Sequence, residues 1–107
     1  MIDFENLDGI FRPQSVAVVG ASDKMGSVGH AVYANLKAAR FPGRLIAVNQ
    51  QHHQVQGDPA WAALDCVSGP LDLVVVCTPA VTVPEIARCC GRLQVRGMVV
   101  ISAGFRE

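Results

Sequence analysis

Runs of small aliphatic residues alternate with segments of helical periodicity along most of the chain. The apolar runs predict strands at 15–19, 44–48, 71–77 and 97–101, and Val55-Gln56 predicts a very short additional strand. Apolar residues at helical spacing predict helices at 3–11, at 27–39 and from Pro84 to Leu93, with a brief helix that begins at Pro59. This order of elements is typical of α/β proteins.

The alternation predicts a doubly wound, Rossmann-like parallel sheet of about five strands, in the order 3-2-1-4-5, with right-handed crossovers. In such sheets the ligand lies outside the carboxyl ends of the strands, where the strand order reverses. We expect four segments to converge at that edge, although they are far apart in the sequence: Gly20-Ala21-Ser22, Asn49, Thr78-Pro79-Ala80 and Ser102-Ala103-Gly104.

The segment after the first strand has the layout of an anion-binding loop. The strand ends at Gly20, Gly26 and Gly29 follow, and a helix then begins, so unpaired N–H groups at the helix start can receive a phosphate. The spacing departs from G-x-G-x-x-G, because Ser22 stands where the second glycine is expected. We expect Gly26 and Gly29 to allow a close approach of the helix to the strand or the ligand.

Two side chains of this loop have two interpretations each. Ser22 either donates its hydroxyl to a phosphate or caps the turn. Lys24 either supplies a point charge near a phosphate or is an exposed loop lysine. The sequence alone leaves both choices open.

The end of the second strand argues against a standard nicotinamide dehydrogenase. NAD binders usually place Asp or Glu there to hold the ribose, and NADP binders use a nearby Arg. This chain has Asn49-Gln50-Gln51 instead. An NAD(H)-binding domain stays an alternative, because an Asn side chain can hydrogen-bond a ribose.

No catalytic or metal-binding constellation is visible in the sequence. His30 falls in the first turns of a helix, where a solvated or capping role is favoured over that of a general base. His52 and His53 lie in a polar loop without further ligands at metal-site spacing. The cysteines form no C-x-x-C pair, and we interpret them as small buried apolar residues in a reducing compartment: Cys66, Cys77, Cys89 and Cys90.

Length and charge narrow the function classes further. The 107 residues predict one domain, and a formal net charge of zero offers no basic surface for nucleic acid. No apolar stretch approaches the roughly 20 residues of a membrane-spanning helix. The N-terminal residues lack the apolar region of a signal peptide, so we expect a cytoplasmic protein.

Nearly the whole chain is covered, in order, by a set of short motifs: FRPQSVAVVGAS at 11–22, GSVG at 26–29, AVN at 47–49, LDLVVV at 71–76 with TPA at 78–80, and GMVVISAGF at 97–105. The set resembles the CoA-binding domain of acyl-CoA synthetases of the NDP-forming type. These enzymes include the ADP-forming acetate–CoA ligases and the α subunit of succinyl-CoA ligase. The resemblance implies coenzyme A as the cofactor.

The resemblance also implies which residues bind CoA. The loop after the first strand holds phosphates in relatives, which corresponds here to Gly20, Ser22, Asp23, Lys24, Met25 and Gly26. The nucleotide part falls on Val48 and Asn49 with Gln51 or His52, and the pantetheine arm on Thr78, Pro79, Ile101, Ser102 and Ala103. Relatives usually read Asn-Pro-Lys after the second strand, whereas Asn49-Gln50-Gln51 lacks the proline and the basic side chain, for which Lys24 or His52 would have to substitute.

In the family, an acyl phosphate meets the CoA thiol, and a phosphohistidine in another domain passes the phosphoryl group to a nucleoside diphosphate. The resemblance therefore implies that residues 1–107 form one CoA-binding domain, the N-terminal fragment of a longer ligase that acts with downstream domains or a partner subunit. The phosphohistidine and nucleotide-grasp domains are not matched. Alternatives are a CoA-binding regulatory region of a protein lysine acetyltransferase, a stand-alone CoA-binding protein and an NAD(H)-binding Rossmann domain.

Overall fold

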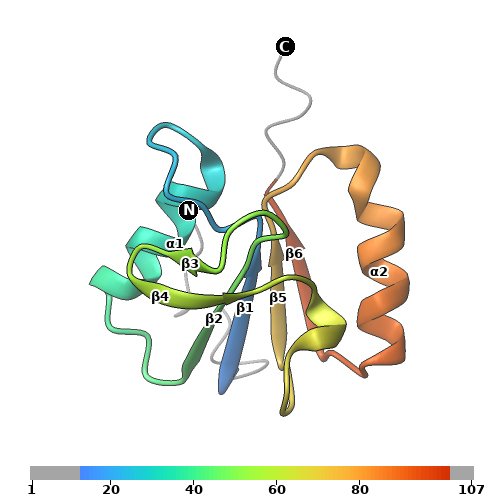
Figure 1. Cartoon of the computed structure of the whole chain (residues 1–107). Coiled ribbons are helices and arrows are strands. Elements are labelled where there is room, and N and C mark those ends of the chain that lie inside the picture. The colour runs from blue at the N-terminus through green and yellow to red at the C-terminus, as the bar shows by residue number, and fades with distance from the viewer. Residues whose placement is uncertain (1–12, 102–107) are drawn as a thin grey trace.

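The computed structural model describes residues 13–101 of the chain. Its sheet has six strands in the order β3-β4-β2-β1-β5-β6 (Figure 1). The elements are β1 Ser15–Val19, α1 Val28–Ala38, β2 Arg44–Val48, β3 Gln54–Val55, β4 Asp58–Trp61, the 3-10 turn η2 Leu64–Cys66, β5 Leu73–Val76, the 3-10 turn η3 Ala80–Thr82, α2 Val83–Arg92 and β6 Gly97–Val100.

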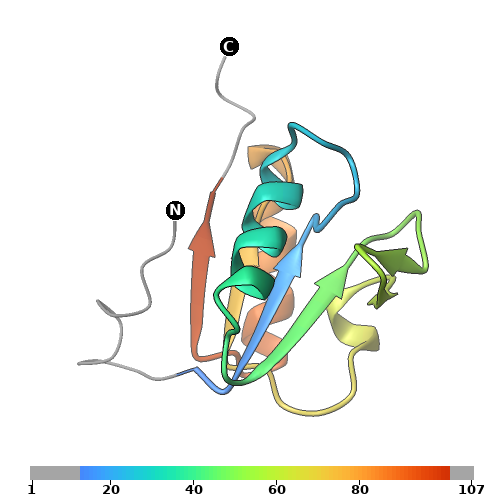
Figure 2. The same ribbon diagram turned by 90° about the vertical axis from the view of Figure 1, so that its left-hand side faces the viewer.

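The predicted doubly wound sheet is confirmed, with one strand more than expected. Strands β4, β2, β1, β5 and β6 are parallel to their neighbours, and only the short β3 runs antiparallel, against β4. Figure 2 shows β1, β2 and β6 pointing the same way, so their carboxyl ends share one edge. The expected order 3-2-1-4-5 holds, with β4 inserted between the short strand and β2.

The prediction of a helix that begins at Pro59 is wrong. Gln56 and Gly57 both have positive φ, 50° and 83°, which makes a two-residue hairpin turn that reverses the chain into β4. Pro59 then lies within β4, opposite Gln54, and the helical turn comes later, at η2. The helix expected at 3–11 lies outside the described residues.

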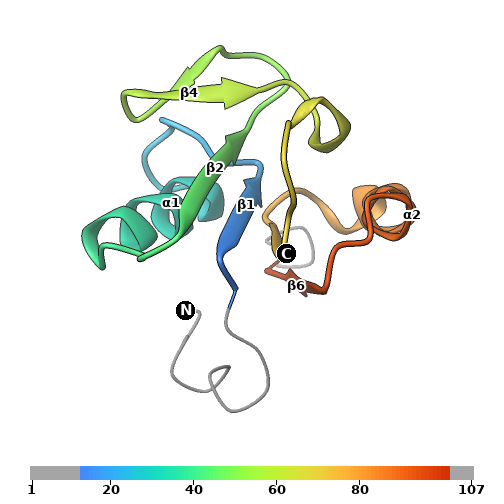
Figure 3. The same cartoon turned by 90° about the horizontal axis from the view of Figure 1, so that it is seen from below.

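Each face of the sheet is buried under one of the two α-helices, which lie on opposite sides when the molecule is seen from below (Figure 3). Val16 and Val18 of β1 face the α1 side, where they pack with Tyr33 and Leu36. The intervening Ala17 faces the α2 side. Burial on both faces explains why the central strands are continuously apolar.

The cysteines follow the predicted burial with one exception. Cys89 and Cys90 of α2 are buried and Cys77 is partly buried, whereas Cys66 is exposed. The prediction failed for Cys66 because the short η2 turn directs Leu64 into the core and leaves its last residue at the surface. Within residues 13–101, no helix is both long and apolar enough to cross a membrane.

Candidate functional site

A groove of about 1050 Å³ lies at the carboxyl edge of the sheet and continues along α2. The ends of β1, β2 and β5 meet there, as the sequence predicts. Of the expected site residues, those that line it are Gly20, Ser22, Lys24, Gly26, Val48, Asn49, Gln51, Thr78 and Pro79. The lining does not include Asp23, Met25, His52 and Ile101, and Ser102 and Ala103 lie outside the described part of the chain.

Glycines bring the groove walls together. A Cβ at Gly29, in the first turn of α1, would come within 1.8 Å of the Gly20 carbonyl oxygen. At Gly20, which has φ +92°, a Cβ would lie 2.9 Å from the Thr78 Cγ2. Gly26 does not bring the helix close to the strand, because a Cβ there meets nothing within 4 Å; its φ of +89° favours glycine, and its close approach to the ligand stays a prediction.

Side-chain hydroxyls shape the loop between Gly20 and α1. The Lys24 N–H donates to the Ser22 Oγ at 2.9 Å, so Ser22 caps the turn as an acceptor, and a phosphate contact through its O–H stays a prediction. The Ser27 Oγ donates to the Lys24 carbonyl at 2.8 Å and accepts from the His30 N–H at 3.1 Å, as an N-cap does. Val28 and Gly29 follow this N-cap and line the groove, and their N–H groups have no partner inside the helix.

Asn49 joins two segments of the site. Its Nδ2 donates to the Ala21 carbonyl at 3.0 Å, and its Oδ1 accepts from the N–H groups of Gln51 and His52 at 2.7 and 2.9 Å. The side chain therefore fixes both the loop after β1 and the turn after β2. Its oxygen already accepts two backbone donors, which disfavours the ribose contact that an NAD(H) domain would need.

The residues that follow β5 also line the groove. The Thr82 Oγ1 donates to the Pro79 carbonyl at 2.6 Å. The Thr78 Oγ1 lies 2.6 Å from the Thr82 Oγ1, and because the Thr82 hydroxyl proton is already used, Thr78 is the donor between the two threonines. Burial raises the pKa of the nearby Cys77 thiol to about 11. This thiol therefore stays protonated at neutral pH and is a poor nucleophile.

Sequence reasoning missed two parts of the lining. One is the β4–η2 connection, residues 62–65, because that region was expected to be helical. The other is the face of α2 with Glu85, Ile86, Cys89 and Arg92, because the sequence of this helix showed only apolar spacing typical of core packing. Glu85 lies in the first turn of α2, and a hydrogen bond from Arg88 at 2.9 Å lowers its pKa.

The three histidines do not form a metal site with other side chains of the described residues. His30 is in the first turn of α1, as predicted, and its backbone groups bond Ser27 and Gln56. His52 contributes a backbone N–H to the turn after β2. Across residues 13–101, no group of three or more His, Cys, Asp or Glu side chains is placed to hold a metal ion.

Comparisons with known proteins match this fold and sequence. The sequence profile of a family described as "CoA binding domain" matches residues 14–107. The chain belongs to the CoA-binding domain family. Coenzyme A is thus the cofactor that family membership assigns to it, as the resemblance implied.

Similar proteins include ADP-forming ligases. The ADP-forming acetate–CoA ligase I of Archaeoglobus fulgidus is 39% identical over 101 residues, which are 94% of this chain and 14% of that protein. The α subunit of the ADP-forming acetate–CoA ligase II of Pyrococcus furiosus is 36% identical, over 94% of this chain and 22% of that subunit. This CoA-binding domain therefore spans less than a quarter of the length of either relative.

A solved structure agrees in fold. The dinucleotide forming acetyl-coenzyme A synthetase 1 of Ca. Korarchaeum cryptofilum, in complex with phosphate and ADP, superposes with a TM-score of 0.83 at 30% identity. The match covers 98% of this chain and 22% of that one.

The residues of the groove fit the chemistry of CoA. Gly20 and Gly29 allow the start of α1 to pack directly against the loop after β1, next to Lys24, and phosphates are favoured at such a helix start. The part next to α2 combines apolar lining residues, among them Ala62, Leu64 and Ile86, with the charged side chains of Asp65, Glu85 and Arg92. An end that favours phosphate, joined to a largely apolar trough, suits a cofactor that carries phosphates on one side and a pantetheine arm on the other.

Proposed function

We propose that the groove binds CoA with its phosphates against residues 20–27 and the start of α1. The pantetheine arm then passes Thr78 and Pro79 toward α2. The observation that supports this most is the placement of Lys24, Ser22 and the α1 N-terminus at the mouth of an apolar groove. Val48 and Asn49, which line the groove, contact the nucleotide part, and the resemblance assigns Ile101, Ser102 and Ala103 to the pantetheine arm.

We further propose that the chain serves as the CoA-holding domain of an ADP-forming acid–CoA ligase. In this role it presents the CoA thiol to an acyl phosphate that is formed in other domains of the same enzyme or in a partner subunit. The ligase relatives support this role over a regulatory region of a lysine acetyltransferase. The free cysteines support a reducing, cytoplasmic location.

Two exposed apolar side chains support contact with a neighbouring domain. Met25, in the loop after β1, is 78% exposed, and Val81, in η3 after β5, is 84% exposed. Both follow strands that end at the groove edge. Apolar side chains at this edge are well placed to be covered by the part of a ligase that delivers the acyl group.

The phosphate assignment is tested by Lys24→Ala, with Arg40→Ala as a control that removes an equal charge beyond the far end of α1. We expect Lys24→Ala to weaken CoA about three- to tenfold, because one charge–phosphate contact is lost. Pantetheine, which has no phosphate, should bind both variants and the wild type equally. If Lys24→Ala lost affinity for CoA and for pantetheine to the same extent in calorimetry, the assignment would be overturned.

A further inference from the structure

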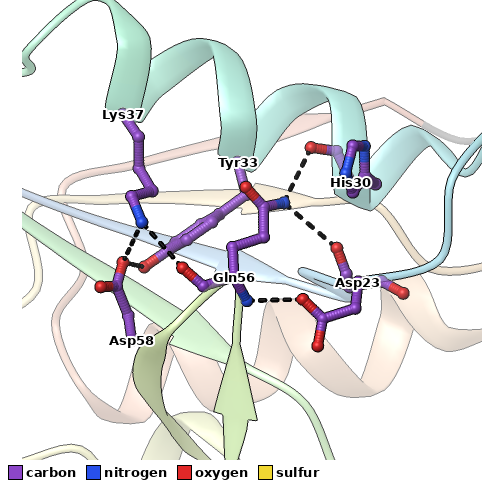
Figure 4. A network of polar contacts seen from close by, with 7 residues as sticks. Asp23, His30, Tyr33, Lys37, Gln56 and Asp58 are labelled. Carbon is purple, nitrogen blue, oxygen red and sulfur yellow. Dashed lines mark hydrogen bonds and ion pairs between the residues drawn. The ribbon is translucent and has the colours of Figure 1, made fainter.

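The turn between β3 and β4 lies against the back of the loop that follows β1. The Gln56 N–H donates to the Asp23 Oδ1 at 2.6 Å. The Gln56 Nε2 donates to the carbonyls of Ser22 and His30, each at 3.2 Å (Figure 4). One residue thus joins the hairpin turn to the loop and to the first turn of α1, across 26 to 34 positions of sequence.

The hairpin turn is itself fixed to α1. The Lys37 Nζ donates to the Gln56 carbonyl at 2.9 Å and lies 3.2 Å from the Asp58 carboxylate. The hydroxyl of the buried Tyr33 donates to the same carboxylate at 2.7 Å. These contacts attach the backbone of Gln56 to α1 (Figure 4), so that its position relative to the helix is determined before any ligand arrives.

The identity of the residue at this position is informative. The first residue of this turn has φ 50°, a conformation in which Asn or Gly is usual and Gln is uncommon. A Gln side chain is one methylene longer than Asn, and its carboxamide reaches both Ser22 and His30. The backbone strain is therefore accompanied by contacts that a glycine could not make.

We propose that Gln56 is a positioning residue for the CoA site. Its contacts hold the loop 20–27 in the shape that receives phosphate. This inference rests on the proposed function. Ser22 and Lys24 line the groove, whereas Gln56 and Asp23 do not, so Gln56 acts on the ligand only through the loop. It reduces the number of loop conformations in the free protein, and so lowers the entropy cost of binding.

The test uses Gln56→Gly, which removes the carboxamide and at the same time relieves the positive φ. The control is Gln94→Gly. Gln94 is also a glutamine at positive φ, 57°, but it is exposed, lies after α2, and only its backbone makes a described hydrogen bond, to Gly91. Both variants gain the same relief of strain, and only one loses the contacts to the loop.

Two measurements on the full chain give the outcome. Hydrogen exchange without ligand should be faster at the Lys24 and Ser27 amides, which are bonded within the loop, in Gln56→Gly but not in Gln94→Gly. Calorimetry should show about tenfold weaker CoA binding for Gln56→Gly alone, from the loss of two hydrogen bonds. Urea unfolding is the control for folding: both variants should show one cooperative transition and be folded under the conditions of the two measurements.

The outcomes separate this inference from the proposed function. Unchanged loop exchange in Gln56→Gly would overturn the inference, whatever the binding result. Faster exchange with undiminished CoA affinity would overturn it too, because the loop would then not need to be held. If the wild type does not bind CoA, the proposed function fails, while the exchange data still decide whether Gln56 holds the loop.

Discussion

At the scale of single residues, the shape of the site depends on glycines, which let two backbone segments come into contact. The α1 helix starts against the loop after β1, with the Gly29 Cα facing the Gly20 carbonyl. The sequence indicated that glycines matter here, but it could not distinguish Gly26 from Gly29, because the distinction depends on the approach of two segments in space. It also placed Asn49 at the site without showing that its side chain bonds to the backbone.

Gly29→Ala and Gly26→Ala should differ sharply. The new Cβ at position 29 would lie 1.8 Å from a backbone oxygen, so α1 must move, and we expect a loss of about 3 kcal/mol in the free energy of unfolding. Position 26 has open space, and the cost there, about 1 kcal/mol, comes from its φ of +89°. Urea unfolding measures both; equal losses would contradict the proposed role of Gly29.

At the scale of elements, the strands that run through the core were predictable and β4 was not. Val74, Val75 and Val76 of β5 form an apolar run buried on both faces, which shows directly in the sequence. Asp58–Trp61 has no such run, and its strand conformation depends on the hairpin turn and on pairing with β2. The β4–η2 part of the groove was missed for the same reason.

The contact of α1 with β4 should show in the alkaline stability of the chain. Burial and the hydrogen bond to Asp58 raise the pKa of Tyr33 well above its ordinary 10.0. A raised pKa means that this stabilisation is complete below pH 10 and is lost as the pH rises, because the unfolded phenol releases its proton first. Burial also raises the thiol pKa values of Cys77, Cys89 and Cys90, so these thiols lower the free energy of unfolding as the pH rises above about 9.

Tyr33→Phe separates the phenol from the thiols. We expect the variant to be about 1–2 kcal/mol less stable at pH 7, since the hydrogen bond to Asp58 is lost. Above pH 10 its free energy of unfolding should fall less steeply than that of the wild type. Urea unfolding between pH 7 and 11 provides the comparison, and parallel declines in the two proteins would show that the Tyr33 pKa is not raised.

At the scale of the whole molecule, the groove joins the carboxyl edge of the sheet to one face of α2. Cys77 lines this groove, while the exposed Cys66 does not. Bound CoA should therefore slow the alkylation of Cys77 and leave that of Cys66 unchanged, as followed by mass spectrometry after cleavage on the N-terminal side of Asp65 and Asp72, which places the two thiols in different peptides. Equal protection of both thiols, or of neither, would place the cofactor elsewhere.

The central claim is that this CoA-binding domain holds CoA in the groove by itself. Calorimetric titration of the chain with CoA, and separately with NADH, at moderate salt tests it most directly. The account predicts saturable binding of one CoA per chain and no heat of binding with NADH. Binding of NADH with no response to CoA would contradict it, and would mean that the groove accommodates a nicotinamide dinucleotide despite the hydrogen bonds that occupy Asn49.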